Sequence, residues 1–130
     1  MSTDSQLDFH QPEIASVLHA LDDSELDALD FGVIGFDGDT MVRRYNQRES
    51  DMAGLALERV LGSALFTAVA PCMNNFLVAQ RFEDAAADST LLDATIDYVF
   101  TLRMRPSKVK LRLVSVPGQA MRYVLVNRRS

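Results

Sequence analysis

The chain has 130 residues, of which 48% are hydrophobic and 24% are charged, a mixture typical of one ordinary globular domain. Its apolar runs are too short to cross a bilayer and its N-terminus lacks a signal-peptide pattern, so we expect a cytoplasmic protein with no membrane partner. The net charge of −5 argues against nucleic acid as a partner, because phosphate binding depends on a basic surface. A single cysteine excludes an internal disulfide and offers no cysteine pair for zinc.

The charges are distributed unevenly between the two ends of the chain. Residues 1–30 contain eight acidic residues and no Lys or Arg, whereas residues 103–130 contain eight basic residues and no acid. This asymmetry predicts that residues 1–30 form an acidic helical cap, which docks on the basic C-terminal strands of a core formed by residues 31–130. The alternative is that the charges are separately solvated, since an exposed ion pair contributes only about 0–1 kcal/mol.

The first part of the chain contains helical and strand patterns in turn. Apolar residues at helical spacing follow Pro12, which suits an early helix position. Asp37, Gly38 and Asp39 supply the turn of a hairpin between two apolar runs. In chain order we expect a helix over 14–21, a second short helix capped by Asp22 or Asp23, a strand over 31–36, and a returning strand over 41–46.

The second part begins irregularly and ends in strands. Residues 47–70 contain short helical fragments broken by Gly54 and Gly62, and irregular connections of this kind are common binding sites. Residues 94–104 alternate apolar and polar side chains, the period of a half-buried strand. We expect a helix over 76–87 with Phe76, Ala79, Phe82 and Ala86 on one side, and strands over 94–104, 109–113 and 121–127.

This order of elements predicts an α+β domain with a central antiparallel five-stranded sheet, flanking short helices and an N-terminal helical cap. Two strands, short helices, one longer helix and three strands follow one another, and this order resembles that of a PAS domain.

Cys72 has two interpretations when it is considered without relatives. A lone cysteine in a cytosolic domain is most often a small buried apolar residue. Nucleophilic catalysis would need a base that generates the thiolate, and the only histidines, His10 and His19, lie in the acidic N-terminal segment. We therefore do not expect an enzyme.

Tyr45 and Glu49 are four residues apart, so a helical turn between them would place both side chains on one face. The simpler alternative is a tyrosine at a strand end and a solvated glutamate. Phe100 and Met104 are most simply interpreted as core residues of their strand. The pattern alone leaves these alternatives open.

Several short motifs follow one another along the chain between Leu21 and Arg128. They are Tyr45-Asn46, Glu49, Asp51, Gly54, Val69-Ala70-Pro71-Cys72, Met104, Pro106 and Lys108-Val109-Lys110. Together they resemble the photoactive yellow proteins, and the similarity continues nearer the N-terminus through Leu26-Asp27, Leu29, Phe31-Gly32, Ile34 and Asp37-Gly38. The cysteine motif alone would be a weak signal, whereas its combination with Tyr-Asn and the glutamate is specific.

The resemblance implies a blue-light photoreceptor with a PAS fold. It implies that p-coumaric acid (4-hydroxycinnamic acid) is bound covalently to Cys72 as a thioester, whose carbonyl is held by the Cys72 backbone N–H. By the same resemblance, Tyr45 and Glu49 donate hydrogen bonds to the phenolate oxygen of this chromophore, and Met104 lies near its ring and assists thermal recovery. The other residues assigned to the chromophore pocket in this way are Ala53, Leu55 and Phe100.

These implied roles agree with the chemistry of a buried phenolate. A phenol loses its proton near pH ~10 in water, and burial raises that value, so the anion needs strong donors. Glu49 can be a donor only in its protonated form, which burial favours. After photoisomerisation, proton transfer from Glu49 would leave a buried carboxylate. Its cost of several kcal/mol is enough to unfold part of the domain and so signal to a partner.

Two positions depart from the family pattern. Ala53 stands where a threonine commonly bonds to the tyrosine, and Leu55 stands where many members have an arginine that shields the pocket. Arg48 or Arg103 could substitute for that arginine. The resemblance therefore does not identify the residue that shields the pocket in this chain.

We expect the partner to be a downstream signalling protein, and the chain itself to be a monomer or weak dimer. The alternative function is a PAS-type protein-interaction module without a chromophore, in which Cys72 is merely buried. A haem-binding PAS domain is not supported because no histidine falls in the core, and the cysteine lacks the surrounding pattern of flavin photosensors. A yellow holoprotein separates the first function from the second.

Overall fold

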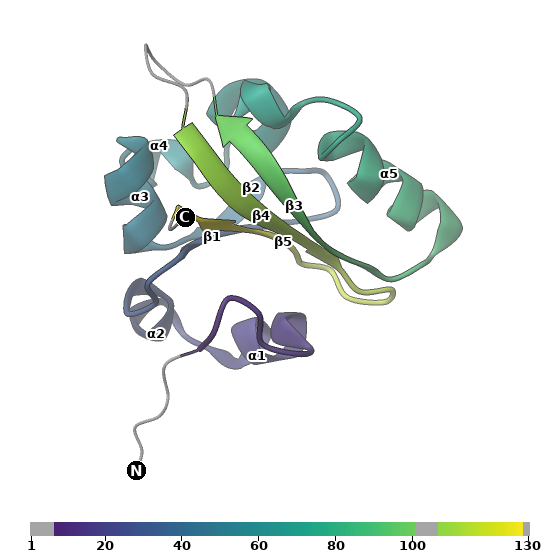
Figure 1. The fold of residues 1–130 in the computed structure, drawn as a ribbon, viewed down its shortest axis with the longest axis horizontal. Helices are drawn as coiled ribbons and strands as arrows, with labels where there is room; N and C mark the ends of the chain where they lie inside the picture. The colour runs from purple at the N-terminus through teal and green to yellow at the C-terminus, as the bar shows by residue number, and fades with distance from the viewer. Residues whose placement is uncertain (1–6, 101–106, 129–130) are drawn as a thin grey trace.

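The computed structural model describes residues 7–100 and 107–128, which form a five-stranded antiparallel sheet flanked by helices (Figure 1). The strand order across the sheet is β2-β1-β5-β4-β3, so β5 occupies the centre and β2 and β3 form the edges. The strands are β1 (Gly32–Phe36), β2 (Val42–Tyr45), β3 (Leu92–Phe100), β4 (Ser107–Ser115) and β5 (Arg122–Asn127). All neighbouring pairs are antiparallel, which confirms the predicted α+β class and sheet.

Within the described residues, five short α-helices, a π-helical turn and a 3-10 turn complete the fold. They are α1 (Ile14–Ala20), α2 (Asp23–Asp27), α3 (Gln47–Ala53), α4 (Leu57–Val60), a π-helical turn (Leu65–Val69), a 3-10 turn (Pro71–Met73) and α5 (Ala79–Asp88). No helix within the described parts of the chain is long and apolar enough to cross a membrane.

The sheet is buried on both faces because successive side chains of a strand point to opposite sides. On β5, Val124 and Val126 join one apolar cluster with α5, whereas Tyr123 and Leu125 join a second cluster with α1 and α2. Figure 1 shows α1 and α2 on one side of the sheet and α5 on the other. β1 is consequently buried at all of its positions and has no polar face.

β3 is an edge strand and keeps the alternation that the sequence shows. Its residues from Leu92 to Val99 alternate between half-buried and exposed, and Phe100 at its end is buried. It pairs with β4 from Leu92 opposite Ser115 to Phe100 opposite Ser107. The strand begins two residues before the predicted start, and the predicted continuation over 101–104 lies outside the described residues.

The predicted helix over 76–87 is wrong at its first turn. The side-chain oxygen of Asn75 accepts hydrogen bonds from the backbone N–H groups of Leu77 and Val78, which holds the chain in a turn before the helix. α5 therefore begins at Ala79, and Phe76 is left 76% exposed. The buried face of α5 is formed by Ala79, Phe82 and Ala85, so the expected Ala86 is also displaced by one position.

The N-terminal cap, defined here as described residues 7–30, contains two short helices, α1 and α2. α1 starts at Ile14 after Glu13, whose φ is 53°, so Pro12 precedes the helix and is not in its first turn. Asp22, rather than Asp23, caps α2. Its side chain accepts from the Glu25 N–H at 2.8 Å, and the Glu25 carboxylate accepts from the Asp22 N–H at 2.9 Å.

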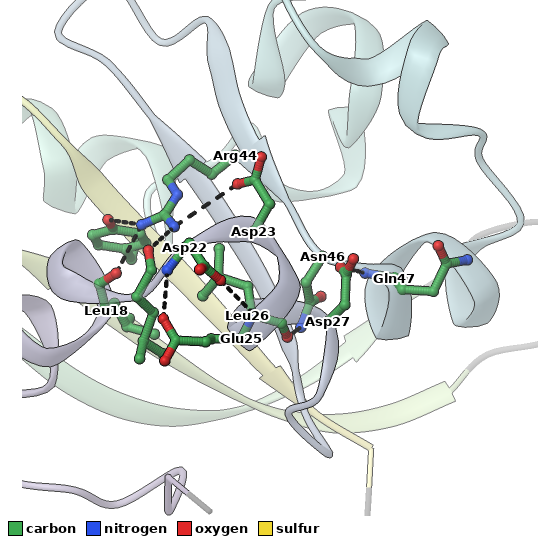
Figure 2. Close-up of polar contacts among 11 residues, drawn as sticks. Leu18, Asp22, Asp23, Glu25, Leu26, Asp27, Arg44, Asn46 and Gln47 are labelled. Carbon is green, nitrogen blue, oxygen red and sulfur yellow. Dashed lines mark hydrogen bonds and ion pairs between the residues drawn. The ribbon is translucent and has the colours of Figure 1, made fainter. Parts of the chain in front are cut away.

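The cap is attached to the sheet by apolar packing and by arginines that bind main-chain carbonyl groups. Arg44 donates to the carbonyl oxygens of Leu18 (2.7 Å) and Leu21, close to the C-terminus of α1 (Figure 2). Arg112 donates in the same way to Phe9 (2.9 Å) and Gln11 (2.8 Å).

These attachments differ from the predicted pairing of acidic with basic side chains. Arg44 lies on β2, outside the basic C-terminal region, and its ion pair with Asp23 spans 3.9 Å to a carboxylate that is 95% exposed. Arg112 belongs to the predicted basic set, but its contacts to the cap go to carbonyl oxygens, and its carboxylate partner is Asp93 of β3. The described contacts of the cap thus include hydrogen bonds from arginine side chains to main-chain carbonyl groups, which the charge pattern did not predict.

Candidate functional site

Glu49 is buried where α3 packs on the sheet, with only 3% of its surface exposed. The helix begins after Asn46, whose side-chain oxygen accepts from the Glu49 backbone N–H at 3.1 Å. The Glu49 carboxyl group lies against Gly32 of β1, so closely that a Cβ atom on Gly32 would overlap a carboxyl oxygen. The glutamate is thus a core residue, and the alternative of a solvated glutamate is wrong.

Tyr45 ends β2 and is 6% exposed. Tyr45 is thus a strand-end tyrosine, as the simpler alternative had it, and no helical turn joins it to Glu49, because the two residues lie on either side of a strand-to-helix junction at Asn46. They are nevertheless close enough for their charges to interact. Burial raises the pKa of the Tyr45 hydroxyl above its usual range, the nearby Glu49 charge raises it further, and the positive charge of Arg128 acts against both.

Arg128 follows β5 and binds Glu49 through a two-pronged ion pair. Its Nη1 donates to Oε1 at 2.7 Å and its Nη2 donates to Oε2 at 3.1 Å. Its guanidinium carbon also lies 5.6 Å from the centroid of the Phe100 ring. Burial raises the pKa of Glu49 above its usual value, while the hydrogen bond and the charge of Arg128 act in the opposite direction.

Cys72 lies in the 3-10 turn and is half-buried against the apolar cluster that contains Tyr45 and Phe100. Burial raises the pKa of its thiol, so the reactive thiolate is disfavoured. Its carbonyl oxygen accepts from the Tyr98 hydroxyl at 2.6 Å and from the Asn75 side-chain amide at 3.2 Å. The Asn75 amide also donates to the Tyr98 oxygen at 2.6 Å, so the turn is fixed to β3.

The two departures from the family pattern occupy the end of α3 and the loop after it. Ala53 lies in the last turn of α3 and offers no side-chain hydroxyl to Tyr45. Leu55 is half-buried and packs against the same apolar cluster as Tyr45. Its carbonyl oxygen accepts from the Ser50 hydroxyl at 2.7 Å. This side of the site is therefore an apolar wall.

The structure brings together Tyr45, Glu49 and Phe100 among the predicted site residues, with Cys72 and Leu55 on the same apolar cluster. Met104 and the proposed substitute Arg103 lie outside the described residues. The other proposed substitute, Arg48, is half-buried on α3. Among the described residues, the arginine that contacts Glu49 is Arg128.

Three residues of the site were not predicted from the sequence. They are Arg128, Tyr98 and Asn75. The sequence pattern could have indicated Tyr98, because the alternation of its strand places it on the same inward face as Phe100. Arg128 had no such signal beyond its place in the basic C-terminal region. No group of His, Cys, Asp and Glu residues in the described parts of the chain could hold a metal ion.

The fold and the site together define the chain as a PAS sensory domain. It superposes on the PAS domain of an HTR-like protein from Haloarcula marismortui with a TM-score of 0.57, at 14% identity, covering 92% of this chain and 100% of that one. A likeness at this identity shows the fold alone. No family model matches the chain.

Higher similarity is found to proteins of one family. The photoactive yellow protein domain of the sensor histidine kinase Ppr from Rhodospirillum centenum superposes with a TM-score of 0.79 at 35% identity, covering 86% of this chain and 97% of that domain. Photoactive yellow protein from Rhodothalassium salexigens is 31% identical over 105 residues, covering 81% of this chain and 83% of the relative. That from Halochromatium salexigens is 30% identical over 120 residues, covering 92% and 95%.

The chain therefore belongs to the photoactive yellow protein family. This result confirms the expected photoreceptor class and the PAS fold of the chain.

Proposed function

We propose that this protein is a blue-light receptor in which p-coumaric acid is bound as a thioester to Cys72, with Tyr45 and Glu49 as donors to its phenolate oxygen. The observation that carries the proposal is the buried carboxyl group of Glu49 beside the buried hydroxyl of Tyr45, on the apolar cluster against which Cys72 packs. Arg128 is the hydrogen-bond partner of this carboxyl group in the described chain, and a phenolate placed beside both side chains would give the Tyr45 hydroxyl an acceptor as well.

The ionisation of the two donors suits an anion between them. Burial raises the pKa of both side chains, while the charge of Arg128 acts against the rise at each, and only the protonated form of either group can donate a hydrogen bond. A donor to an oxyanion makes a short and strong hydrogen bond. The site is thus chemically fitted to hold a phenolate, although neither donor carries a positive charge.

Cys72 fits the role of an attachment point better than that of a catalytic nucleophile. Its thiolate is disfavoured by burial, whereas a thioester is uncharged and costs less to bury than a thiolate. Attachment needs an activated acyl donor: Cys72 Sγ forms a bond to the acyl carbon, the bond from that carbon to the leaving group breaks, and the thiol proton departs with the leaving group. Tyr98 and Asn75 fix the carbonyl group of Cys72 and so hold the turn in one orientation.

When bound, p-coumarate would supply absorption of blue light and isomerisation about its double bond. In the dark Glu49 would hold its proton on a carboxyl oxygen, and after illumination it would give that proton to the phenolate oxygen. Phe100 and Leu55 would exclude water from this proton transfer, since both pack on the same apolar cluster. We expect Ala53 to line the pocket, and Met104 to assist thermal recovery.

We propose that the partner is a downstream signalling protein that this chain meets in the cytoplasm as a monomer or weak dimer. The related photoactive yellow protein domain from Rhodospirillum centenum is part of a sensor histidine kinase, which shows the kind of output such a domain serves in that protein.

The proposal is tested by supplying the purified protein with an activated thioester of p-coumaric acid. We expect a mass increase on Cys72 and a visible absorption band that bleaches in blue light. Cys72→Ala and Cys72→Ser should form no adduct that survives denaturation. A wild-type protein that stays colourless and unmodified would instead favour the PAS-type interaction module without a chromophore.

A further inference from the structure

We infer that Arg128 is a positioning residue that receives the Glu49 carboxylate whenever Glu49 is ionised, so that a negative charge formed in the pocket is paired at the end of β5. The light-dependent part of this inference rests on the proposed function. The pairing itself is a property of the polypeptide alone.

The geometry of the pair is that of a preformed carboxylate receptor. The two Arg128 nitrogens meet the two Glu49 oxygens at 2.7 and 3.1 Å, the parallel arrangement in which a guanidinium group binds a carboxylate most specifically. The side chains of Arg128 and Glu49 are 15% and 5% exposed, so solvent screens the pair weakly. The Phe100 ring, 5.6 Å from the guanidinium carbon, supports the cation from another side.

The other surroundings of Glu49 offer no second cation in the described parts of the chain. β1 presents Gly32, which leaves room for the carboxyl group, and β2 presents Tyr45, which is neutral while it keeps its proton. Leu55 packs against the apolar cluster at the position where the family resemblance implied an arginine. Arg128 therefore supplies, from the centre of the sheet, the positive charge that position 55 lacks.

Glu49 has two uses that exclude one another. As a neutral carboxyl group it can donate to an anion in the pocket, and as a carboxylate it can accept from Arg128. When the O–H bond of Glu49 breaks and its proton moves to the phenolate oxygen, the total charge of the site is unchanged, but the negative charge now lies next to Arg128. Because Arg128 pairs this charge where it forms, we expect the structural change after illumination to be centred on the end of β5. It should involve fewer residues than the partial unfolding that an unpaired buried charge would cause.

The pairing can be tested without a chromophore by following the Glu49 carboxyl carbon in a pH titration by NMR, with carbon-labelled glutamate and Glu49→Gln for assignment. We expect Arg128→Gln to raise the proton affinity of Glu49 by about ten- to a thousandfold, because an adjacent opposite charge lowers a carboxyl pKa by about 1–3 units. Arg122→Gln, at the other end of β5, is the matched control and should leave the titration unchanged. An unchanged titration in Arg128→Gln would overturn the inference.

Arg128→Gln could fail to fold because it leaves Glu49 buried without its cation. The double variant Glu49→Gln/Arg128→Gln resolves this outcome. If the pair is real, removing the charge on Glu49 should restore folding, whereas a double variant that remains unfolded would show that Arg128 acts through contacts other than the pair and would overturn the inference.

The light-dependent part is tested by hydrogen exchange on the protein carrying p-coumarate, in the dark and under steady illumination. In the wild type we expect lost protection to be concentrated in β5, and in Arg128→Gln we expect it to extend into α3 and β1. Identical light-induced exchange in the two proteins would overturn this part. Failure of Cys72 to take up the acyl group would overturn the proposed function instead, and the titration would still decide the pairing.

Discussion

The proton of Glu49 is subject to two opposing influences. Burial raises the pKa of this carboxyl group above its usual value of 4.5, and Arg128 reduces the rise. Because the folded chain then binds the proton more tightly than the unfolded chain, this group stabilises the fold fully below pH 4.5. The contribution is lost as the pH rises through the folded-state pKa.

Glu49→Gln should remove this pH dependence from the chromophore-free protein. Relative to that variant, the wild type should lose free energy of unfolding as the pH rises above 4.5, since a buried carboxyl group must then ionise. Urea denaturation at a series of pH values measures the difference. Glu58→Gln, at an exposed position of α4, is the control and should follow the wild type. A wild-type slope equal to that of Glu49→Gln would contradict the expectation.

Single residues of the site differed in how far they could be predicted. The spacing and the motif pointed to Tyr45, Glu49 and Cys72, because short-range patterns and family resemblance are both visible in the sequence. Arg128 is 79 residues from Glu49 along the chain. The two meet only because β5 pairs with β1, with Val126 opposite Gly32, and because α3 packs on β1 at that point. No local pattern carries that information.

Secondary-structure elements were predicted best where one face is solvent-exposed. β3 is half-buried and its alternation could be read directly, whereas β1 is buried throughout and was recognised by its flanking turn residues. α5 was extended too far because the apolar spacing of Phe76 fits a helix. Apolar periodicity does not show where a side chain such as Asn75 binds the backbone and delays the helix.

Substitutions of Phe82 in α5 and of Phe76 before it should differ in their effect on the free energy of unfolding. Phe82→Ala should lower the free energy of unfolding by about 3–5 kcal/mol, because Phe82 is 1% exposed and its loss leaves a cavity. Phe76→Ala should change it by less than about 0.5 kcal/mol, because Phe76 makes no buried contact to lose. Chemical denaturation measures both. Equal costs would place Phe76 on the packed face of the helix after all.

At the scale of the whole molecule, the contacts that join the cap and the sheet among the described residues include apolar packing and buried arginines, which salt screens weakly. The apolar cluster between α1, α2 and the sheet contains Ile14, Leu18 and Leu26, and Arg44 and Arg112 bind carbonyl oxygens with little of their side chains exposed. The predicted acidic cap on a basic surface would instead weaken in salt, because the Debye length falls to about 3 Å at 1 M.

Hydrogen exchange of α1 and α2 should therefore be nearly the same at low and high salt. Arg44→Gln should lower the protection of these helices, because two carbonyl groups near the end of α1 lose their donor. Arg43→Gln is the adjacent control, since Arg43 makes an exposed ion pair with Asp37 in the hairpin. If high salt lowered the protection of these helices in the wild type, ion pairs between side chains would instead be what holds the cap on the sheet.

β5 touches both halves of the molecule at once. The hydroxyl oxygen of Tyr123 accepts from Arg44, which holds the cap, and Arg128 beyond the end of the same strand binds Glu49. Two sites coupled through one element must influence each other by the same factor, since the coupling free energy belongs to both. A molecule that binds the cap should thus change the proton affinity of Glu49, and protonation of Glu49 should change the affinity of the cap for that molecule by the same factor.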